Sequence, residues 1–285
     1  MDVALTMMTA LMMAGSYHLQ FGQVRLPSGI RLSYAEQGDP GGPALILLHG
    51  YSDSWFSFSR ILPLLNPGYH VYALDLRGHG DSDRPAGGYA MGELAGDVLA
   101  FMDDRSLARA TIVGHSMGSL VAQQIAARAP KRVARLVLIG SLAAPGRSAT
   151  LQELATTVRG FRNAVPDEFI REFQLSSVHR PMPAEFVNRV IGESRKLPIH
   201  VWRGSVEGMV AAQPAAALRA SGIPTLMLWG EQDGFFNRKD QEELLQLVPT
   251  ARLKIYPETG HTPQWERPEE VVNDLDGFFA RTASR

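Results

Sequence analysis

A strand-like segment that passes through two glycines into a helix-like segment constrains this chain more than any other feature. The stretch ATIVGHSMGSLVAQQIAAR starts with β-branched residues, continues through Gly114-His115-Ser116-Met117-Gly118, and ends in a helical pattern. A strand that turns this sharply into a helix holds its pivot residue in a strained conformation, and side chains two positions away would collide with it. Glycine on both sides relieves that collision. The pattern therefore predicts that Ser116 stands at a strand-to-helix turn with its hydroxyl above a sheet, placed to attack a carbonyl.

The other apolar segments predict a mostly parallel, eight-stranded sheet with helices on both faces. From residue 44 onward the strand-like segments are continuous apolar runs, which is typical of strands covered on both faces. Helical patterns alternate with them, and this alternation indicates a doubly wound sheet. The expected strands are 24–27, 30–38, 44–50, 70–76, 110–115, 133–140, 224–230 and 251–257, and the expected helices are 55–64, 91–105, 117–129, 237–247 and 267–281.

One interval breaks this alternation. Between the sixth strand, which ends at Gly140, and the seventh, which starts near Pro224, the periodicity is helical only, and six prolines divide it into short helices. An all-helical insertion at the edge of a parallel sheet indicates a lid over a site. We therefore predict an N-terminal extension (1–20), an α/β core (21–141 and 222–285) and a helical cap (142–221).

The first residues bear on where the protein works. Residues 3–15, VALTMMTALMMAG, have the length of a signal-peptide core, but no Lys or Arg precedes them and Asp2 stands where positive charge is expected. We therefore expect a cytoplasmic protein, with secretion through residues 1–20 as the alternative.

The charge balance and the missing cysteines narrow the function classes. Lys and Arg together number 28 against 29 Asp and Glu, so there is no net field to attract nucleic acid or an anionic membrane. The absence of cysteine excludes thiol nucleophiles, disulfides and thiolate metal sites. We expect a small-molecule substrate, no nucleic-acid or membrane partner, and a monomer or homodimer.

A serine hydroxyl needs a base to take its proton, and the base needs an acid to fix its tautomer. In this architecture the order along the chain is serine, acid, histidine, which leaves three histidines after Ser116. His179 and His200 fall within the helical insertion, whereas His261 follows the last strand in a loop that can reach the carboxyl edge of the sheet. His261 is therefore the predicted base.

The predicted acid is Asp233, in the loop after the strand LMLWG and ahead of His261. Glu231 in the same loop is the competitor. Some relatives of such folds carry the acid after the strand that follows the elbow helix, but here that position reads IGSLAAPG and offers no carboxylate.

An oxyanion needs two hydrogen-bond donors. The backbone N–H of Met117 directly follows the nucleophile, and the loop after ALILLHG supplies the second donor, which we assign to the N–H of Tyr51. Gly50 allows that backbone to approach closely. The cluster in DLRGHGDSDRP is interpreted as a hydrogen-bonded turn built on Asp75, Arg77 and Asp81, and not as a metal or phosphate site.

Together these segments resemble the α/β-hydrolase superfamily, and more narrowly its cap-bearing esterases, lactonases and carbon–carbon bond hydrolases. The resemblance is carried by HGYSDSW, DLRGHGDS, GHSMGS, WGEQDGFF and ETGHTPQWERPEE, which span nearly the whole domain. It implies a serine hydrolase that needs neither a metal nor an organic cofactor. Related epoxide hydrolases and haloalkane dehalogenases have an aspartate at the elbow, so Ser116 argues against both activities.

Two alternatives stay open beside ester or lactone hydrolysis. The meta-cleavage type carbon–carbon hydrolases share the three residue types, although the glycine-rich oxyanion loop and the asparagine before the serine that mark many of them are replaced by Tyr51 and His115. A non-catalytic ligand-binding protein on the same fold is the other. The cap is expected to place apolar side chains over the pocket, and the predicted substrate-contacting residues are Gly50, Trp55, His115, Phe161, Trp202 and Phe235.

Overall fold

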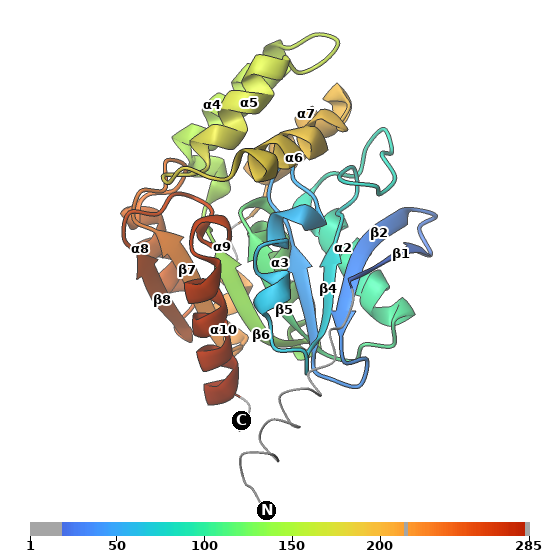
Figure 1. The fold of residues 1–285 in the computed structure, drawn as a ribbon, viewed down its shortest axis with the longest axis vertical. Helices are drawn as coiled ribbons and strands as arrows, with labels where there is room; N and C mark the ends of the chain where they lie inside the picture. The colour runs from blue at the N-terminus through green and yellow to red at the C-terminus, as the bar shows by residue number, and fades with distance from the viewer. Residues whose placement is uncertain (1–18, 214–215, 283–285) are drawn as a thin grey trace, which may run out of the picture.

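The computed structural model describes residues 19–213 and 216–282, so most of the predicted extension 1–20 lies outside the described residues. The described chain contains one eight-stranded sheet in the order β1-β2-β4-β3-β5-β6-β7-β8, in which only β2 runs antiparallel to its neighbours. The mostly parallel sheet is thus confirmed (Figure 1). Its strands are β1 Gln20–Arg25, β2 Arg31–Gly38, β3 Ala44–Leu48, β4 His70–Leu74, β5 Ala110–His115, β6 Val133–Ile139, β7 Thr225–Gly230 and β8 Ala251–Tyr256.

The central strands are apolar throughout because both faces of the sheet are covered. Along β3, Ile46 and Leu48 belong to a core shared with helices α2 (Met91–Asp104), α3 (Met117–Arg128) and α8 (Arg238–Leu247). Leu45 and Leu47 point to the opposite face and pack in a second core with α10 (Pro268–Thr282). Successive side chains of a strand alternate between faces, so a continuous apolar run supplies both cores.

The predicted helix over 55–64 is wrong. The segment forms two short 3₁₀ helices, η1 Trp55–Phe58 and η2 Leu62–Leu64. Pro63 lies in the first turn of η2, and a proline has no N–H to continue a helix that began earlier. The side chain of Ser54 accepts a hydrogen bond from the N–H of Phe56 and fixes the start of η1.

Between β6 and β7 the described chain has no strand and consists of short helices joined by loops. Figure 1 shows α4 to α7 gathered at one end of the sheet. Pro166, Pro183 and Pro198 stand directly before α5, α6 and α7, where a missing N–H costs nothing. These elements are η4 Pro145–Arg147, α4 Ala149–Gly160, α5 Asp167–Ser176, α6 Ala184–Arg195, α7 Ile199–Val210 and η5 Ala216–Ala220, and two further short elements lie elsewhere in the chain, η3 Pro130–Arg132 and α9 Pro263–Glu266.

Within the described ranges, no helix has both the length and the apolar character that crossing a membrane requires.

Candidate active site

The turn between β5 and α3 holds Ser116 in a conformation that few residues adopt. Its backbone has φ 50° and ψ −116°, and α3 begins at the next residue. A Cβ on Gly114 would lie 2.3 Å from the carbonyl oxygen of Gly118, and a Cβ on Gly118 would lie 2.1 Å from that of Leu48. Both glycines are therefore required by steric crowding, although the crowding is against backbone atoms and not against the serine itself. Strain of this kind is characteristic of functional sites.

Asp233 and His261 are hydrogen-bonded to each other. The distance from Asp233 Oδ2 to His261 Nδ1 is 2.8 Å, and the carboxylate is fully buried. The other oxygen, Oδ1, accepts hydrogen bonds from the backbone N–H groups of Phe235 and Phe236 at 2.8 and 3.1 Å. Because a carboxylate only accepts, Nδ1 of His261 carries the proton, and in the neutral ring Nε2 keeps a lone pair. That is the tautomer that a general base requires.

The competing candidates lie elsewhere. The side chain of Glu231 is exposed, as are those of His179 and His200. The carbonyl oxygen of Ser177 accepts a hydrogen bond from the backbone N–H of His261 at 2.9 Å and so fixes the loop that carries this residue.

Ser116 and His261 line one cavity beneath the α4–α7 helices. The lining residues enclose about 400 Å³ free of protein atoms, part of it open to solvent. The helices contribute apolar walls through Leu151 and Leu154 of α4, Phe173 of α5 and Met209 of α7.

The loop after β3 brings a second backbone N–H to the cavity. Gly50 and Tyr51 both line it. In the described chain, neither the N–H of Tyr51 nor that of Met117 donates a hydrogen bond to another protein group. A Cβ on Gly50 would lie 2.8 Å from Nδ1 of His115, which explains the glycine at this position.

Buried hydrogen bonds join this loop to the helices above it. The hydroxyl of Tyr51 donates to the carbonyl oxygen of Trp202 on α7 at 2.7 Å. Nε2 of Gln174 on α5 lies 3.2 Å from Ser52 Oγ, and Ser194 Oγ on α6 donates to the carbonyl oxygen of Ser52 at 3.0 Å. Three helices thus hold one loop.

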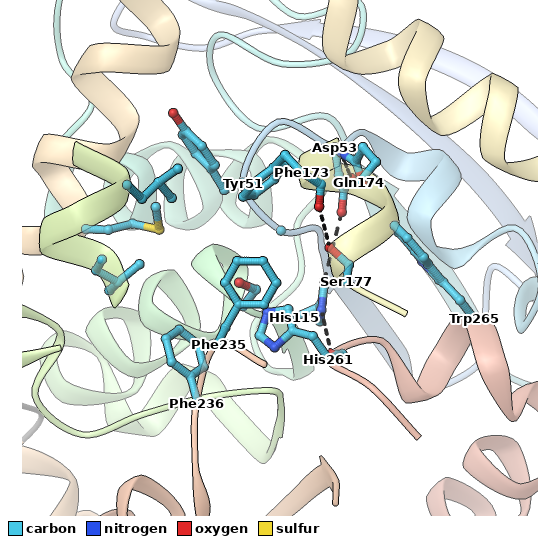
Figure 2. Close-up of a pocket in the computed structure, with 15 residues that line it drawn as sticks. Tyr51, Asp53, His115, Phe173, Gln174, Ser177, Phe235, Phe236, His261 and Trp265 are labelled. Carbon is cyan, nitrogen blue, oxygen red and sulfur yellow. Dashed lines mark hydrogen bonds and ion pairs between the residues drawn. The ribbon is translucent and has the colours of Figure 1, made fainter. Parts of the chain in front are cut away.

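Three of the predicted substrate-contacting residues line the cavity and three do not. Gly50, His115 and Phe235 line it, as Figure 2 shows for the two labelled side chains, His115 and Phe235. The ring of Trp55 instead packs edge-on against Phe21 at 5.0 Å and faces a separate groove. Phe161 packs on Phe169 at 5.0 Å, and Trp202 is fully buried behind the ring of Tyr51 at 5.1 Å. Helical periodicity identifies apolar faces but does not say which of them face a cavity.

Sequence reasoning missed several residues that line the cavity, among them Asp53, Gln174, Ser177 and Trp265. Asp53 follows Tyr51 in the HGYSDSW segment and Trp265 lies in GHTPQW, so both were within quoted motifs. Gln174 and Ser177 carry no motif signal.

Burial perturbs the ionisable groups of this cavity. It raises the pKa of Asp53 to about 7. It also lowers the pKa of His115 well below the usual range, and the neighbouring His261 adds to the effect. His115 is therefore neutral near pH 7.

The DLRGHGDS segment is a braced turn. Asp75 Oδ1 accepts from the N–H of Trp55 at 2.8 Å, and Oδ2 accepts from the N–H of Asp81 at 2.9 Å. The carbonyl oxygen of Arg77 takes part in the turn, 3.0 Å from Nδ1 of His79, whereas its side chain forms two hydrogen bonds, each 2.7 Å long, with Asp97 on α2.

A strained serine at a strand-to-helix turn, in one cavity with a carboxylate-bound histidine, is the arrangement of hydrolases built on doubly wound sheets. A family model described as alpha/beta hydrolase fold matches residues 43–268, and the chain belongs to this family.

Its relatives have several activities by name. Epoxide hydrolase 3 of Xenopus tropicalis is 28% identical, over 94% of this chain and 80% of that protein. 3-oxoadipate enol-lactonase 2 of Acinetobacter baylyi is 26% identical, over 88% of this chain and 94% of that protein. Among solved structures, a bacterial membrane phospholipase A superimposes with a TM-score of 0.81 at 26% identity, covering 99% of this chain and 91% of that one. The protein is thus similar to hydrolases of more than one kind.

Proposed function

We propose that this protein is a serine hydrolase that cleaves carboxylic esters or lactones through an acyl-enzyme. One observation carries the proposal: the strained Ser116 shares a cavity with His261, whose Nδ1 is held by the buried carboxylate of Asp233. No other histidine that follows Ser116 lines that cavity.

In the proposed mechanism, Nε2 of His261 takes the proton of Ser116 Oγ as that oxygen attacks the ester carbonyl. The backbone N–H groups of Tyr51 and Met117 receive the negative charge on the carbonyl oxygen. Removing one such donor typically costs about 2.7 to 4 kcal/mol of barrier. His261 then gives its proton to the leaving alcohol and activates a water that releases the acid.

The identity of the elbow residue supports ester chemistry over epoxide opening, since an aspartate marks the elbow of related epoxide hydrolases. A relative named for enol-lactone cleavage, aligned over most of both chains, supports the ester and lactone class.

The test is covalent labelling together with turnover. A fluorophosphonate probe should label Ser116, and p-nitrophenyl butyrate should be hydrolysed; Ser116→Ala should lose both while keeping its thermal unfolding transition. Ser177→Ala removes another hydroxyl from the same cavity and should retain labelling. Turnover that survives in Ser116→Ala would dismiss the nucleophile.

A further inference from the structure

The cavity has two unlike sides. In Figure 2, Phe235 and Phe236 lie on one side, and Asp53, Gln174 and Ser177 gather on the other. We call the second group, with His115, the polar side. The mechanism above uses none of its side chains.

The hydrogen-bond donors of the polar side are already engaged. Nε2 of Gln174 lies 2.8 Å from Ser194 Oγ and 3.2 Å from both Ser52 Oγ and Asp53 Oδ1, so its two hydrogens have acceptors. The hydroxyl of Ser177 donates to the carbonyl oxygen of Phe173 at 3.3 Å.

The same holds for His115. Its Nε2 lies 3.2 Å from the carbonyl oxygen of His261, and a carbonyl only accepts, so Nε2 carries the proton. Nδ1 of the neutral ring is then an acceptor. His115 is 2% exposed and its Nδ1 has no hydrogen-bond partner.

A second acceptor faces this nitrogen. Oδ2 of Asp53 lies 4.0 Å from His115 Nδ1, too far for a direct hydrogen bond, and its one side-chain donor is Ser57 at 3.3 Å. In the described chain, no Lys or Arg forms an ion pair with Asp53, which is 4% exposed. A buried carboxylate without a cation is costly, and a donor placed beside it offsets that cost.

The spacing suits one ligand atom. An amine nitrogen about 2.8 Å from each acceptor can donate to both across the 4.0 Å gap, whereas a hydroxyl has one hydrogen and donates to one of the two. With acceptors free and donors engaged, the polar side favours a group that donates hydrogen bonds and disfavours an anion.

We propose that the polar side binds a hydroxyl or protonated amine of the substrate between His115 Nδ1 and Asp53 Oδ2, so that donor-bearing esters are preferred over esters with a methyl group in the same place. This inference rests on the proposed function only in treating the ligand as a substrate. The binding of a hydrogen-bond donor follows from the geometry alone.

The test uses ester pairs that differ only by a donor and a methyl group. On the acyl side these are methyl β-hydroxybutyrate and methyl β-aminobutyrate against methyl isovalerate; on the alcohol side, propylene glycol monobutyrate against isobutyl butyrate. At about pH 8, kcat/KM should be at least about tenfold higher for a donor-bearing ester in one of the two series.

Variants separate recognition from folding. Asp53→Asn puts an amide donor where the carboxylate accepts, so the preference should fall to within about twofold. Ser57→Ala removes the one side-chain donor to Oδ2 but keeps the carboxylate, and it should retain the preference. Thermal unfolding of both variants checks the fold, and a preference that persists in a folded Asp53→Asn overturns the assignment.

Binding of the same esters to Ser116→Ala, measured by NMR titration, does not depend on turnover. Rapid hydrolysis with equal kcat/KM within every pair would leave the proposed function standing and overturn this inference. If the wild type hydrolyses neither these esters nor p-nitrophenyl butyrate, the proposed function fails. A tenfold affinity difference in Ser116→Ala would then still support the donor site, and equal affinities would refute it.

Discussion

Gly140 directly follows β6 and lies against the proposed base, so replacing it by alanine tests that base without substituting any reacting residue. Its φ is +51°, and a Cβ there would lie 2.9 Å from Cε1, from Nδ1 and from the carbonyl oxygen of His261. Ordinary contacts begin near 3.4 Å, so the ring must retreat by about 0.5 Å. Nδ1 is the atom that bonds Asp233 Oδ2 at 2.8 Å, so this shift lengthens or misaligns that bond.

The expected loss of activity follows from this displacement. A misplacement of about 1 Å can cost about a hundredfold in rate, and loss of the carboxylate's control of the imidazole costs about ten-thousandfold. We therefore expect Gly140→Ala to lower kcat for p-nitrophenyl butyrate by about a hundredfold. The left-handed backbone adds about 1 to 2 kcal/mol of destabilisation.

Gly222 provides the matched control. Its φ is +64°, but a Cβ there meets nothing within 4 Å. Gly222→Ala should therefore show the same loss of unfolding free energy in urea and an unchanged kcat. If Gly140→Ala keeps wild-type kcat while both variants are equally destabilised, the contact with His261 does not matter and the reasoning is refuted.

Three further predictions concern the acid, the loop after β3 and pH. Asp233→Asn should lower kcat about ten-thousandfold and Glu231→Gln should leave it within twofold; the reverse result would make Glu231 the acid. Tyr51→Phe removes the hydrogen bond from the Tyr51 hydroxyl to the carbonyl of Trp202, which keeps its bond within α7. The change should cost about 0.5 to 1.5 kcal/mol of unfolding free energy in urea, with kcat changed less than tenfold, since the N–H of residue 51 remains. Burial raises the pKa of Asp53 from 3.8 to about 7, so the folded state holds this proton more tightly than the unfolded one. The free energy of unfolding that this proton contributes, at most about 4 kcal/mol, is present below pH 3.8 and is lost as pH rises through 7. Asp53→Asn should therefore flatten the fall of the unfolding free energy in urea between these pH values. An unchanged slope would contradict the raised pKa of Asp53.

The features that sequence predicted are those dictated by local sterics or by continuous burial. The strand-to-helix turn at Ser116 allows only glycine at two positions, so the pattern is visible in the letters. Strands β3 to β8 appear as apolar runs, with β8 less completely buried than the rest. The pairing of Asp233 with His261 could be predicted because both follow strands that end at the same edge of the sheet.

The features that sequence did not predict depend on tertiary contacts. Whether Phe173 or Trp202 faces the cavity depends on how α5 and α7 rotate above the sheet, which periodicity leaves open. Asp53 is buried, and its Oδ1 accepts a hydrogen bond from Gln174, which lies more than a hundred residues later in the chain. The apolar spacing of 55–64 suggested one helix, but Pro63 has no N–H to continue a helix that began earlier.

The attachment of the loop after β3 to three cap helices has a consequence for evolution and engineering. Exchanging residues 142–221 for the corresponding insertion of another hydrolase would remove Gln174, Ser194 and the carbonyl of Trp202 together, and with them the hydrogen bonds that hold Tyr51, the proposed oxyanion donor, and Ser52. Under the proposed mechanism, selectivity and turnover are therefore expected to be coupled, and a transplanted insertion would need a compensating change in residues 50–53.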